Sequence, residues 1–450
     1  MMTTRKRIIL SLVLLSYFIT AIDGSIVITG LTRITDDLHL SHEELSWVQN
    51  AYLLSFGGFM LMGGGLGDAF GRKRIFKLSL ILFGIGSLGA GMSQSAGMMI
   101  AARFMQGLGS AVLAPTSLAL IMDYFDGGER VKAVAWYGSI SGLGLCIGLI
   151  VGGAITSYAS WRDVFLVNIP IIAVMLLLSV KSLSGKKIKK TKFDVCGTLL
   201  SVSGIFCMLY AIDGAENMMI WLIAGTLLII LFVFTEQKTH RPIMPLRLFY
   251  STDRRNAYIA RALLIGALMG YNFFISEFMQ EVFGFTPLMT GFAFLPMTIT
   301  TFIGAVRVPA LVEKYGNKWV LAFGLAMLVV GFCGLLFLNK ESCYSIGIAL
   351  PMLFIGFGQG LAMSPLTNLG LSDVEHVDAG AASGLVNVAH QVGGAFGLSL
   401  MVSASNGLTD MASRCHIGMW IALCCIVAAL LISFIKSVLK HYWFIRMKFW

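Results

Sequence analysis

The stretch that decides the fold is Gly63-Gly64-Gly65-Leu66-Gly67-Asp68-Ala69-Phe70-Gly71-Arg72-Lys73-Arg74, which lies between two long apolar segments. It combines five glycines, one carboxylate and three cations. Glycines permit a tight turn and a close approach of two helix ends. Cations beside a membrane-length apolar run mark the cytoplasmic side of a membrane. The stretch therefore predicts a short cytoplasmic turn between two membrane helices.

The composition of the whole chain also indicates a membrane protein. Of its 450 residues, 57% are hydrophobic and 12% are charged, whereas a soluble protein carries about 25% charged residues. We therefore expect an all-α membrane protein whose main partner is the lipid bilayer. The net charge of +10 does not indicate a nucleic-acid partner, because the cations sit in short loops. The eight cysteines form no C-x-x-C pair, so we expect no metal site and no disulfide.

Apolar runs of the length that a spanning helix needs, about 20 residues, recur along the whole chain. Hydropathy and turn signals predict fourteen spans, over residues 8–30, 46–66, 75–94, 98–122, 133–156, 163–181, 195–213, 218–236, 257–282, 288–310, 319–339, 344–370, 381–404 and 416–437. With both termini inside, the inside segments hold 27 of the 33 Lys and Arg residues and the outside segments hold four. This bias predicts a multi-pass protein of the plasma membrane with both termini in the cytoplasm.

Two basic stretches, 184–192 and 237–256, divide the predicted spans into groups of six, two and six. We therefore expect an N-terminal six-helix bundle over 1–184, basic linkers with two inserted helices over 185–256, and a C-terminal six-helix bundle with a cytoplasmic tail over 257–450. Residues 311–318 repeat residues 66–73 in register, after the second span of the second bundle. Such a repeat is expected when two bundles arise by duplication.

The charges of the opening stretch have a candidate partner in Asp123, which ends the fourth span on the same side. We expect Arg72 to pair with Asp123, while Asp68 faces the start of the span near residue 381. Such a network can latch helices in one conformation and release them in another. The predicted conformational gate consists of Gly67, Asp68, Gly71, Arg72 and Asp123. For Lys73 and Arg74 we prefer the alternative that the charges only set the topology.

Three charged residues lie inside predicted spans at a similar depth, roughly 8 to 10 Å from the outer ends. They are Asp23 in the first span, Arg103 in the fourth and Glu277 in the ninth. A buried arginine costs about 2.5 to 3.5 kcal/mol on the insertion scale and therefore needs a partner. We assign Asp23 to proton binding, Arg103 to tuning Asp23, and Glu277 to binding a proton or a substrate charge. The alternative for Glu277 is a place at the outer surface near Glu281.

Several motifs resemble those of the major facilitator superfamily. Residues 64–74 are similar to its signature loop G-x-L-G-D-x-x-G-R-K-R, and residues 103–111 to its fourth-helix motif R-x-x-Q-G-x-G-x-A, whose arginine is linked to proton movement in that family. Residues 161–170 resemble W-R-x-x-F-x-x-N-x-P of the fourteen-helix drug/proton antiporters. Residues 23–28 resemble their D-x-T-I-V-N motif, with Ser25 and Ile28 as departures.

The fifth predicted span is similar to the antiporter motif G-x-x-x-G-P-x-x-G-G, through Gly144, Gly148, Gly152 and Gly153. Leu149 stands at the proline position, so the kink that the motif implies is not supplied by proline. Spacings of four place the first three glycines on one helix face, where a neighbouring helix can approach closely. The alternative is that these glycines serve packing alone and do not set the direction of transport.

The resemblance implies a major facilitator fold of two six-helix bundles plus an inserted helix pair. It also implies a proton-coupled exporter of lipophilic, often cationic drugs that works by alternating access. The chain has no Walker motif and no catalytic arrangement. We therefore expect no enzyme and no cofactor, with the proton gradient as the energy source. The nearest alternative is a transporter of one metabolite, organic anion or lipid, and a further one is a membrane sensor or enzyme.

A substrate pocket is expected between the bundles, with apolar and aromatic walls. Nothing in the sequence requires more than a monomer. The candidate substrate-binding residues are Trp47, Tyr52, Gln106, Tyr271, Asn272, Phe273, Phe278, Gln359, Asn368, Asn387 and His390.

Overall fold

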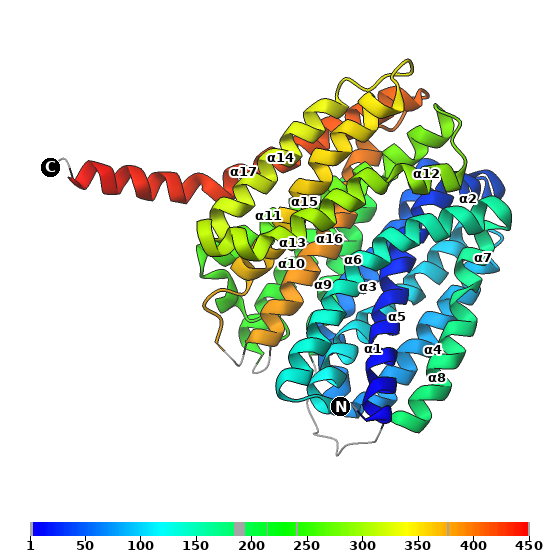
Figure 1. Cartoon of the computed structure of the whole chain (residues 1–450), viewed down its shortest axis with the longest axis vertical. Coiled ribbons are helices and arrows are strands. Elements are labelled where there is room, and N and C mark those ends of the chain that lie inside the picture. The colour runs from blue at the N-terminus through cyan, green and yellow to red at the C-terminus, as the bar shows by residue number, and fades with distance from the viewer. Residues whose placement is uncertain (1–2, 184–193, 214, 240–241, 376–377, 449–450) are drawn as a thin grey trace.

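The computed structural model describes residues 3–183, 194–213, 215–239, 242–375 and 378–448, without the side chains of Asp68, of some residues within 131–146 and of residues 434–448. The elements in these ranges are helical (Figure 1). The helices are α1 (Thr4–Ile26), η1 (Ile28–Gly30), α2 (Leu31–Leu38), α3 (His42–Phe70), α4 (Arg72–Gly91), α5 (Ala96–Tyr124), α6 (Gly127–Tyr158), α7 (Trp161–Leu166), α8 (Asn168–Ser182), α9 (Val195–Ile212), α10 (Met218–Lys238), η2 (Leu246–Phe249), α11 (Thr252–Glu281), α12 (Pro287–Ala293), α13 (Leu295–Tyr315), α14 (Asn317–Leu335), η3 (Ser345–Ala349), α15 (Leu350–Gly370), α16 (Ala379–Ala404) and α17 (Met411–Lys448).

The two ends of the helix array differ in how the helices begin. At one end, here called the Ser160 end, Ser41, Ser95, Ser160 and Thr286 accept hydrogen bonds from the first turns of α3, α5, α7 and α12. Side-chain caps of this kind satisfy backbone N–H groups that have no partner within the helix. The other end, here called the Gly71 end, contains the turn between α3 and α4 and the starts of α1 and α11.

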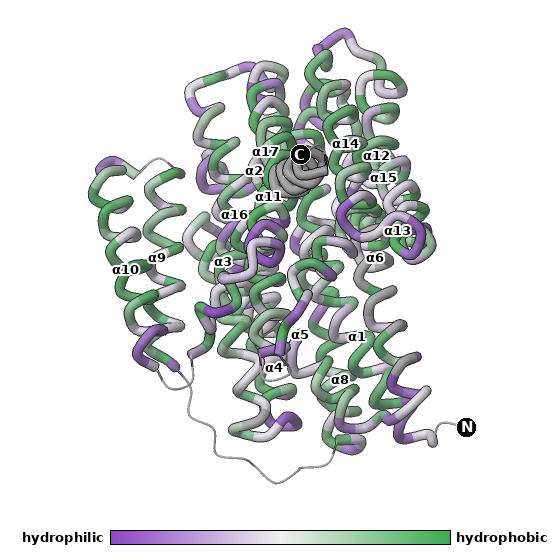
Figure 2. The backbone as a smooth tube through the Cα atoms, turned by 90° about the vertical axis from the view of Figure 1, so that its left-hand side faces the viewer, coloured by the Kyte–Doolittle hydropathy of each residue, from purple (hydrophilic) through white to green (hydrophobic). Residues whose placement is uncertain are grey.

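Twelve helical runs of the described chain are long and apolar enough to cross a membrane. In the hydropathy-coloured tube of Figure 2, hydrophobic residues dominate the middle of the helices and hydrophilic residues gather toward their ends. Two further helices, α3 and α6, have 29 and 32 residues. The apolar part recognised within α6, Ile147–Tyr158, is shorter than a span. The structure thus confirms an all-α membrane protein, while the count of fourteen stays a prediction.

The helices pack in two main groups. Helices α1 to α8 contact mostly one another, and so do α11 to α17. The pair α9 and α10 packs together, and α9 also contacts α3 and α16 (Figure 1). Below, "first half" means α1 to α8 and "second half" means α11 to α17.

Two turns at the Gly71 end share one backbone conformation. Gly71 ends α3 and begins α4 with φ of 92°, and Gly316 ends α13 and begins α14 with φ of 80°. Positive φ is open to glycine and strained for residues with a Cβ. The register between residues 66–73 and 311–318 therefore corresponds to a matching turn in each half.

At the Ser160 end, hydrogen bonds join the two halves. Ser276 of α11 donates to the carbonyl of Ile28 at 2.8 Å, and the backbone N–H of Leu288 donates to Ser157 Oγ at 3.0 Å. The large buried core also continues from Ile28 and Leu31 in the first half into α11 and α16 of the second. The ion pairs described at the Gly71 end, in contrast, do not join one half to the other, and they include Arg72 with Asp123 and Lys318 with Asp253. The molecule is thus closed at its Ser160 end.

We expect Gly71→Ala to lower the thermal stability of the detergent-solubilised protein, because alanine at this positive φ is strained by about 1 to 3 kcal/mol. The matched control is Gly97→Ala, since Gly97 lies in the first turn of α5 and a Cβ there meets nothing within 4 Å. Its melting temperature should stay the same or rise slightly. Equal melting temperatures for Gly71→Ala and the unchanged protein would show that a Cβ at residue 71 causes no backbone strain in this turn.

Candidate functional site

A buried ion pair forms the centre of the first half. Arg103 Nη1 of α5 lies 2.5 Å from Asp23 Oδ2 of α1, and both side chains are completely buried. Removing a carboxylate and a guanidinium from water costs several kcal/mol for each ion, so good geometry and further hydrogen bonds are needed to hold them. The pairing predicted from their similar depth is confirmed.

Neutral amides complete the surroundings of Asp23. Gln106 donates to Asp23 Oδ1 at 3.0 Å, and Asn168 lies 3.3 Å from the same oxygen. Gln106 follows Arg103 by three residues, a spacing that places both on one face of α5, and it also accepts from Arg103 Nη1 at 2.8 Å. Asn168 is the first residue of α8, after the break at Val167. Ser87 of α4 contacts both amides.

The arginine makes further contacts with α3. Arg103 Nε donates to the carbonyl of Val48 at 3.1 Å, and its guanidinium carbon lies 4.4 Å from the centre of the Tyr52 ring. The hydroxyl of Tyr52 in turn contacts Ser110 at 3.1 Å. Arg103 Nη2 is buried and has no hydrogen-bond partner among the described residues. Tyr52 and Gln106, predicted as substrate contacts, are therefore parts of the Asp23–Arg103 network.

Small residues make this network possible. A Cβ at Gly86 of α4 would lie 2.6 Å from the backbone nitrogen of Gln106, so only glycine lets α4 and α5 approach this closely.

The glycines of α6 lie against α1. A Cβ at Gly144 would lie 2.7 Å from Cβ of Ala21, and one at Gly152 would lie 2.5 Å from Cγ1 of Ile26. Gly148 lies against Ser25 in the same way. The predicted glycine face of the fifth span is thus the contact face with α1.

Gly153 and Leu149 of α6 face the second half instead. A Cβ at Gly153 would collide with the backbone of Pro287, and a Cβ at Gly291 would lie 2.5 Å from the carbonyl oxygen of Leu149. The motif therefore packs α6 against α1 on one face and against α12 on another. Leu149, at the proline position of the motif, is buried at this second contact.

Glu277 belongs to a separate cluster at the Ser160 end. Its carboxylate is buried, Oε1 lies 3.9 Å from His42 Nδ1 of α3, and Oε2 has no hydrogen-bond partner among the described residues. Arg414 of α17 contacts the other ring nitrogen of His42. The surface alternative for Glu277 is wrong, because α11 turns this carboxylate into the protein. No described hydrogen bond or ion pair joins Glu277 to the Asp23–Arg103 network.

At the Gly71 end, Arg72 Nη1 lies 2.9 Å from Asp123 Oδ2 and donates to the carbonyl of Ala119 at 2.8 Å. The predicted pair of the conformational gate is therefore present. Gly67 lies beside it, because a Cβ there would meet Arg72 Cγ at 3.2 Å. The side chain of Asp68 lies outside the described part of the chain, so its contact with the start of α16 stays a prediction.

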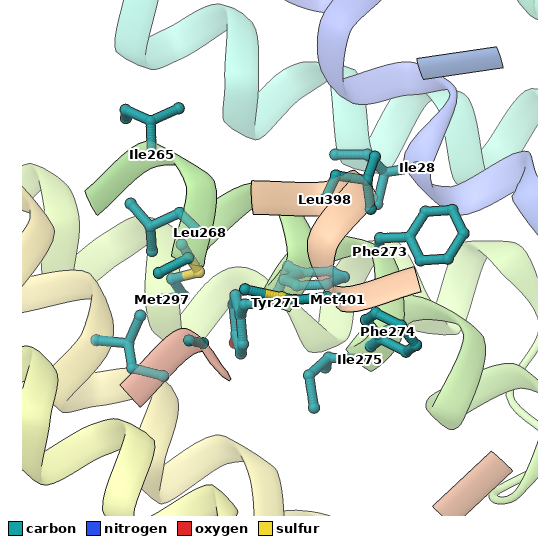
Figure 3. Close-up of a cluster of buried hydrophobic side chains, with 14 of the residues drawn as sticks. Ile28, Ile265, Leu268, Tyr271, Phe273, Phe274, Ile275, Met297, Leu398 and Met401 are labelled. Carbon is teal, nitrogen blue, oxygen red and sulfur yellow. The ribbon is translucent and has the colours of Figure 1, made fainter. Parts of the chain in front are cut away.

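The aromatic substrate candidates of α11 are packing residues in this conformation. Tyr271, Phe273 and Phe278 are fully or almost fully buried, and Figure 3 shows Tyr271 and Phe273 among other apolar side chains of the large core. The Tyr271 ring makes edge contacts with Phe294 and Phe332. In this conformation none of the three is accessible to a ligand.

The remaining candidates fall in different places. Trp47 packs on Phe206 and Tyr210 of α9. Asn368 is exposed and donates to Asn317 at 3.0 Å, which corrects its prediction as a pocket residue, because the end of α15 carries it to the Gly71 end. Asn387 donates to the carbonyl of Ser383 within α16. Asn272 and Gln359 are half-buried and make no described side-chain hydrogen bond. The Oε1 atom of Gln359 is itself buried.

His390 lies in a polar cluster of the second half that the sequence reasoning missed. Its Nδ1 is 3.4 Å from Arg261 Nη2 of α11, and Arg261 Nη1 donates to Thr367 Oγ1 at 2.9 Å. Arg261 was counted among the loop cations, yet it lies ten residues inside α11, which begins at Thr252. The span predicted over 257–282 already contains Arg261, so its place among the loop cations was a wrong assignment. His42, Asn168 and Arg414 were also missed, although Asn168 stands in a quoted motif.

A cavity of about 460 Å³ lies beside the second half. Its walls are apolar and come mainly from α11 and α16, with Ile212 of α9 and Cys425 of α17. The predicted substrate residues do not line it. The pocket expected between the two halves is therefore not this cavity.

An all-helical membrane fold in two packed halves, with an ion pair buried inside one of them, is that of a membrane transporter rather than an enzyme. The Major Facilitator Superfamily model matches residues 13–398, and the chain belongs to this family. It is 32% identical over 412 residues to the puromycin resistance protein pur8 of Streptomyces alboniger, covering 89% of this chain and 82% of the relative.

Two further comparisons agree with this family. The cephamycin export protein CmcT of Amycolatopsis lactamdurans is 32% identical over 408 residues, covering 88% of this chain and 84% of the relative. The crystal structure of a D-xylose-proton symporter matches with a TM-score of 0.70 at 15% identity, covering 95% of this chain and 97% of that structure. The structural likeness establishes the fold.

We expect Arg103→Ala to destabilise the folded protein by about 3 to 5 kcal/mol, because it leaves the Asp23 carboxylate buried without its counter-charge. The double variant Asp23→Asn/Arg103→Gln should recover most of this loss, since neither side chain is then charged. Thermal unfolding in detergent measures both. If the double variant is no more stable than Arg103→Ala, the pair is not electrostatically coupled.

Proposed function

We propose that the protein is a proton-coupled exporter of lipophilic, often cationic drugs. Membership of the Major Facilitator Superfamily supports transport, and the names of two relatives, a puromycin resistance protein and a cephamycin export protein, support export of antibiotics. These names refer to different antibiotics, which favours a broad range of drugs over one metabolite. The observation that carries the proposal is the Asp23–Arg103 pair, a protonatable carboxylate fully buried in a membrane-spanning half.

The Gly71 end is assigned to the cytoplasm, and both termini with it, in a plasma-membrane protein. The excess of Lys and Arg in the segments of this end supports the assignment. The closed Ser160 end then faces outside. Drug enters from the cytoplasmic side and leaves when the outer end opens.

The chain is proposed to span the membrane fourteen times, as in the fourteen-helix drug/proton antiporters. The lengths of α3 and α6 support the two additional spans. The packing supports bundles over 1–184 and 257–450, with α9 and α10 as an inserted pair within 185–256. The proposed working unit is a monomer.

The proton gradient is the proposed energy source, with no resident cofactor. When Asp23 is ionised, its carboxylate accepts hydrogen bonds from Arg103 and Gln106. The side-chain amide of Asn168 also donates toward it. A proton on Asp23 removes the attraction that holds Arg103, so that the contacts of α1 with α5 and α8 weaken together. Protonation from outside and deprotonation toward the cytoplasm then alternate two arrangements of these helices. The Arg72–Asp123 pair latches the cytoplasmic end in one of them.

We expect Asp23→Asn to abolish uncoupler-sensitive efflux of a cationic dye from energised cells, down to the rate of cells without the protein, because asparagine carries no exchangeable charge. The matched control is Asp36→Asn, an exposed carboxylate of α2, which should keep efflux. Full proton-dependent efflux by Asp23→Asn would refute the assigned role. Efflux of one metabolite without any dye or drug would favour the narrower alternative.

Glu277 is proposed to bind the charge of a cationic substrate, because its buried Oε2 has no described partner. We expect Glu277→Gln to reduce efflux of a cationic dye several-fold and to leave efflux of a neutral drug nearly unchanged. Parallel efflux assays with the two compounds measure this. An equal loss for both compounds would instead assign Glu277 to proton binding.

A further inference from the structure

A further buried carboxylate, that of Asp213, lies where the inserted pair meets both halves. It is the residue that follows α9 at the Ser160 end, one position beyond the span Val195–Ile212. Its side chain is 6% exposed. An aspartate at a helix end is usually hydrated, so a buried one at this place requires an explanation.

Asp213 makes its hydrogen bonds with residues from two other elements. Ser399 of α16 donates to Asp213 Oδ2 at 3.0 Å, and Asn50 Nδ2 of α3 lies 3.4 Å from the same oxygen. Asn50 also donates to Ser399 Oγ at 2.8 Å. The three side chains therefore form a triangle that joins the first half, the second half and the inserted pair.

The triangle lies on the closed side of the molecule. Ser399 is five residues before the end of α16, and Asn50 is eight residues after the start of α3 at the Ser160 end. Asn50 and Ser399 belong to different halves, so their hydrogen bond has to break when the halves separate at this end. Asn50 and Ser399 then no longer both cover Asp213, and its carboxylate becomes hydrated.

The triangle also contains buried acceptors that lack a donor. Among the described residues, Oδ1 of Asp213 and Oδ1 of Asn50 are both buried without a hydrogen-bond partner. An ionised carboxylate can only accept hydrogen bonds, whereas a protonated one also donates. A proton on Asp213 therefore supplies the donor that this site lacks.

The groups around Asp213 do not neutralise its charge. The pKa of this carboxyl is raised to about 7, chiefly by burial. Hydrogen bonds from Ser399, Asn50 and Ser46 oppose this rise, and the like charge of Glu43 on α3 adds to it. Glu43 itself accepts from Asn406 at 2.6 Å. The main groups that shift this pKa include no cation.

We propose that Asp213 is a proton-binding site of the inserted helix pair and that closure of the outer end takes up a proton there. The proposal rests on the proposed function for the naming of the outer end. It gives the inserted pair a role in transport: α9 holds the two halves together through Asp213 when this carboxyl is neutral.

The sign of the pH dependence follows from the two environments. Asp213 has a pKa of about 7 in the closed form and is expected near its ordinary value of 3.8 once hydrated. The closed form therefore binds the proton more tightly, and acid favours closure. Between about pH 4 and pH 7, each unit of pH changes the closure equilibrium by up to about tenfold through this group. Above pH 7 this contribution to closure is lost.

Closure can be measured without transport, through the contact of Ser157 with Leu288. We expect the pair Ser157→Cys/Leu288→Cys, in lipid nanodiscs without drug or gradient and with copper phenanthroline as the oxidant, to cross-link several-fold faster at pH 5 than at pH 8 once each rate is divided by that of a reference pair. The reference is Ser16→Cys/Ser117→Cys, whose hydroxyls lie 2.7 Å apart within the first half, and it corrects for the smaller thiolate fraction in acid. Adding Asp213→Asn should remove most of this difference by raising the rate at pH 8, because asparagine is always neutral. Each single-cysteine variant gives the background from the native cysteines.

The matched control is Glu216→Gln, an exposed carboxylate three residues further on, which should keep the pH dependence. Ser399→Ala retains the acid and removes a hydrogen bond that favours its ionised form, so it should move the midpoint to higher pH. An unchanged pH dependence in both Asp213→Asn and Ser399→Ala would overturn the proposal. Because no drug is present, this result is independent of the efflux assays that test the proposed function.

Discussion

The structure depends on one constraint, that a charge inside a membrane domain must be held by other groups of the protein. Asp23 and Arg103 are both completely buried, and four helices supply the contacts that water would otherwise give them. Helix α5 contributes Arg103 itself and Gln106, and α8 contributes Asn168. Helix α4 contributes Ser87, and α3 contributes the carbonyl of Val48 and the Tyr52 ring. Because these partners come from four helices, the Asp23–Arg103 network links α1 to the packing of α3, α4, α5 and α8.

The contacts between the two halves meet a different requirement. They must hold the halves together in this conformation and still allow them to separate. Their contacts at the Ser160 end combine a continuous apolar core with a few polar contacts, such as Ser276 with Ile28 and Asn50 with Ser399. Glycines let α6 lie close to both α1 and α12. The inserted pair is not a passive addition in this arrangement, since Trp47 packs on α9 and Asp213 reaches the seam between α3 and α16.

Much of the fold and part of the site followed from the sequence. The predicted spans correspond to helices, and the pairs Asp23–Arg103 and Arg72–Asp123 were anticipated, because depth along a helix can be counted from residue number. The sequence did not predict where the candidate substrate-binding residues lie. Tyr271 is packed within the core and Asn368 lies at a helix end, because the rotation of each helix about its axis is set by packing. Arg261 was missed because it was counted as a loop cation, although it lies within the span predicted over 257–282.

The sequence by itself determined that the chain is a helical membrane protein, where its helices turn, which end carries the positive charge, and which acids lie at membrane depth. These properties depend on hydropathy, on local backbone freedom at residues such as Gly71, and on distance along a helix, all of which are local. Only the tertiary structure decided that Glu277 faces His42, that Gln106 and Asn168 share Asp23, and that Asp213 joins three elements. Such contacts join residues far apart in the chain, and they depend on the orientation in which whole helices pack.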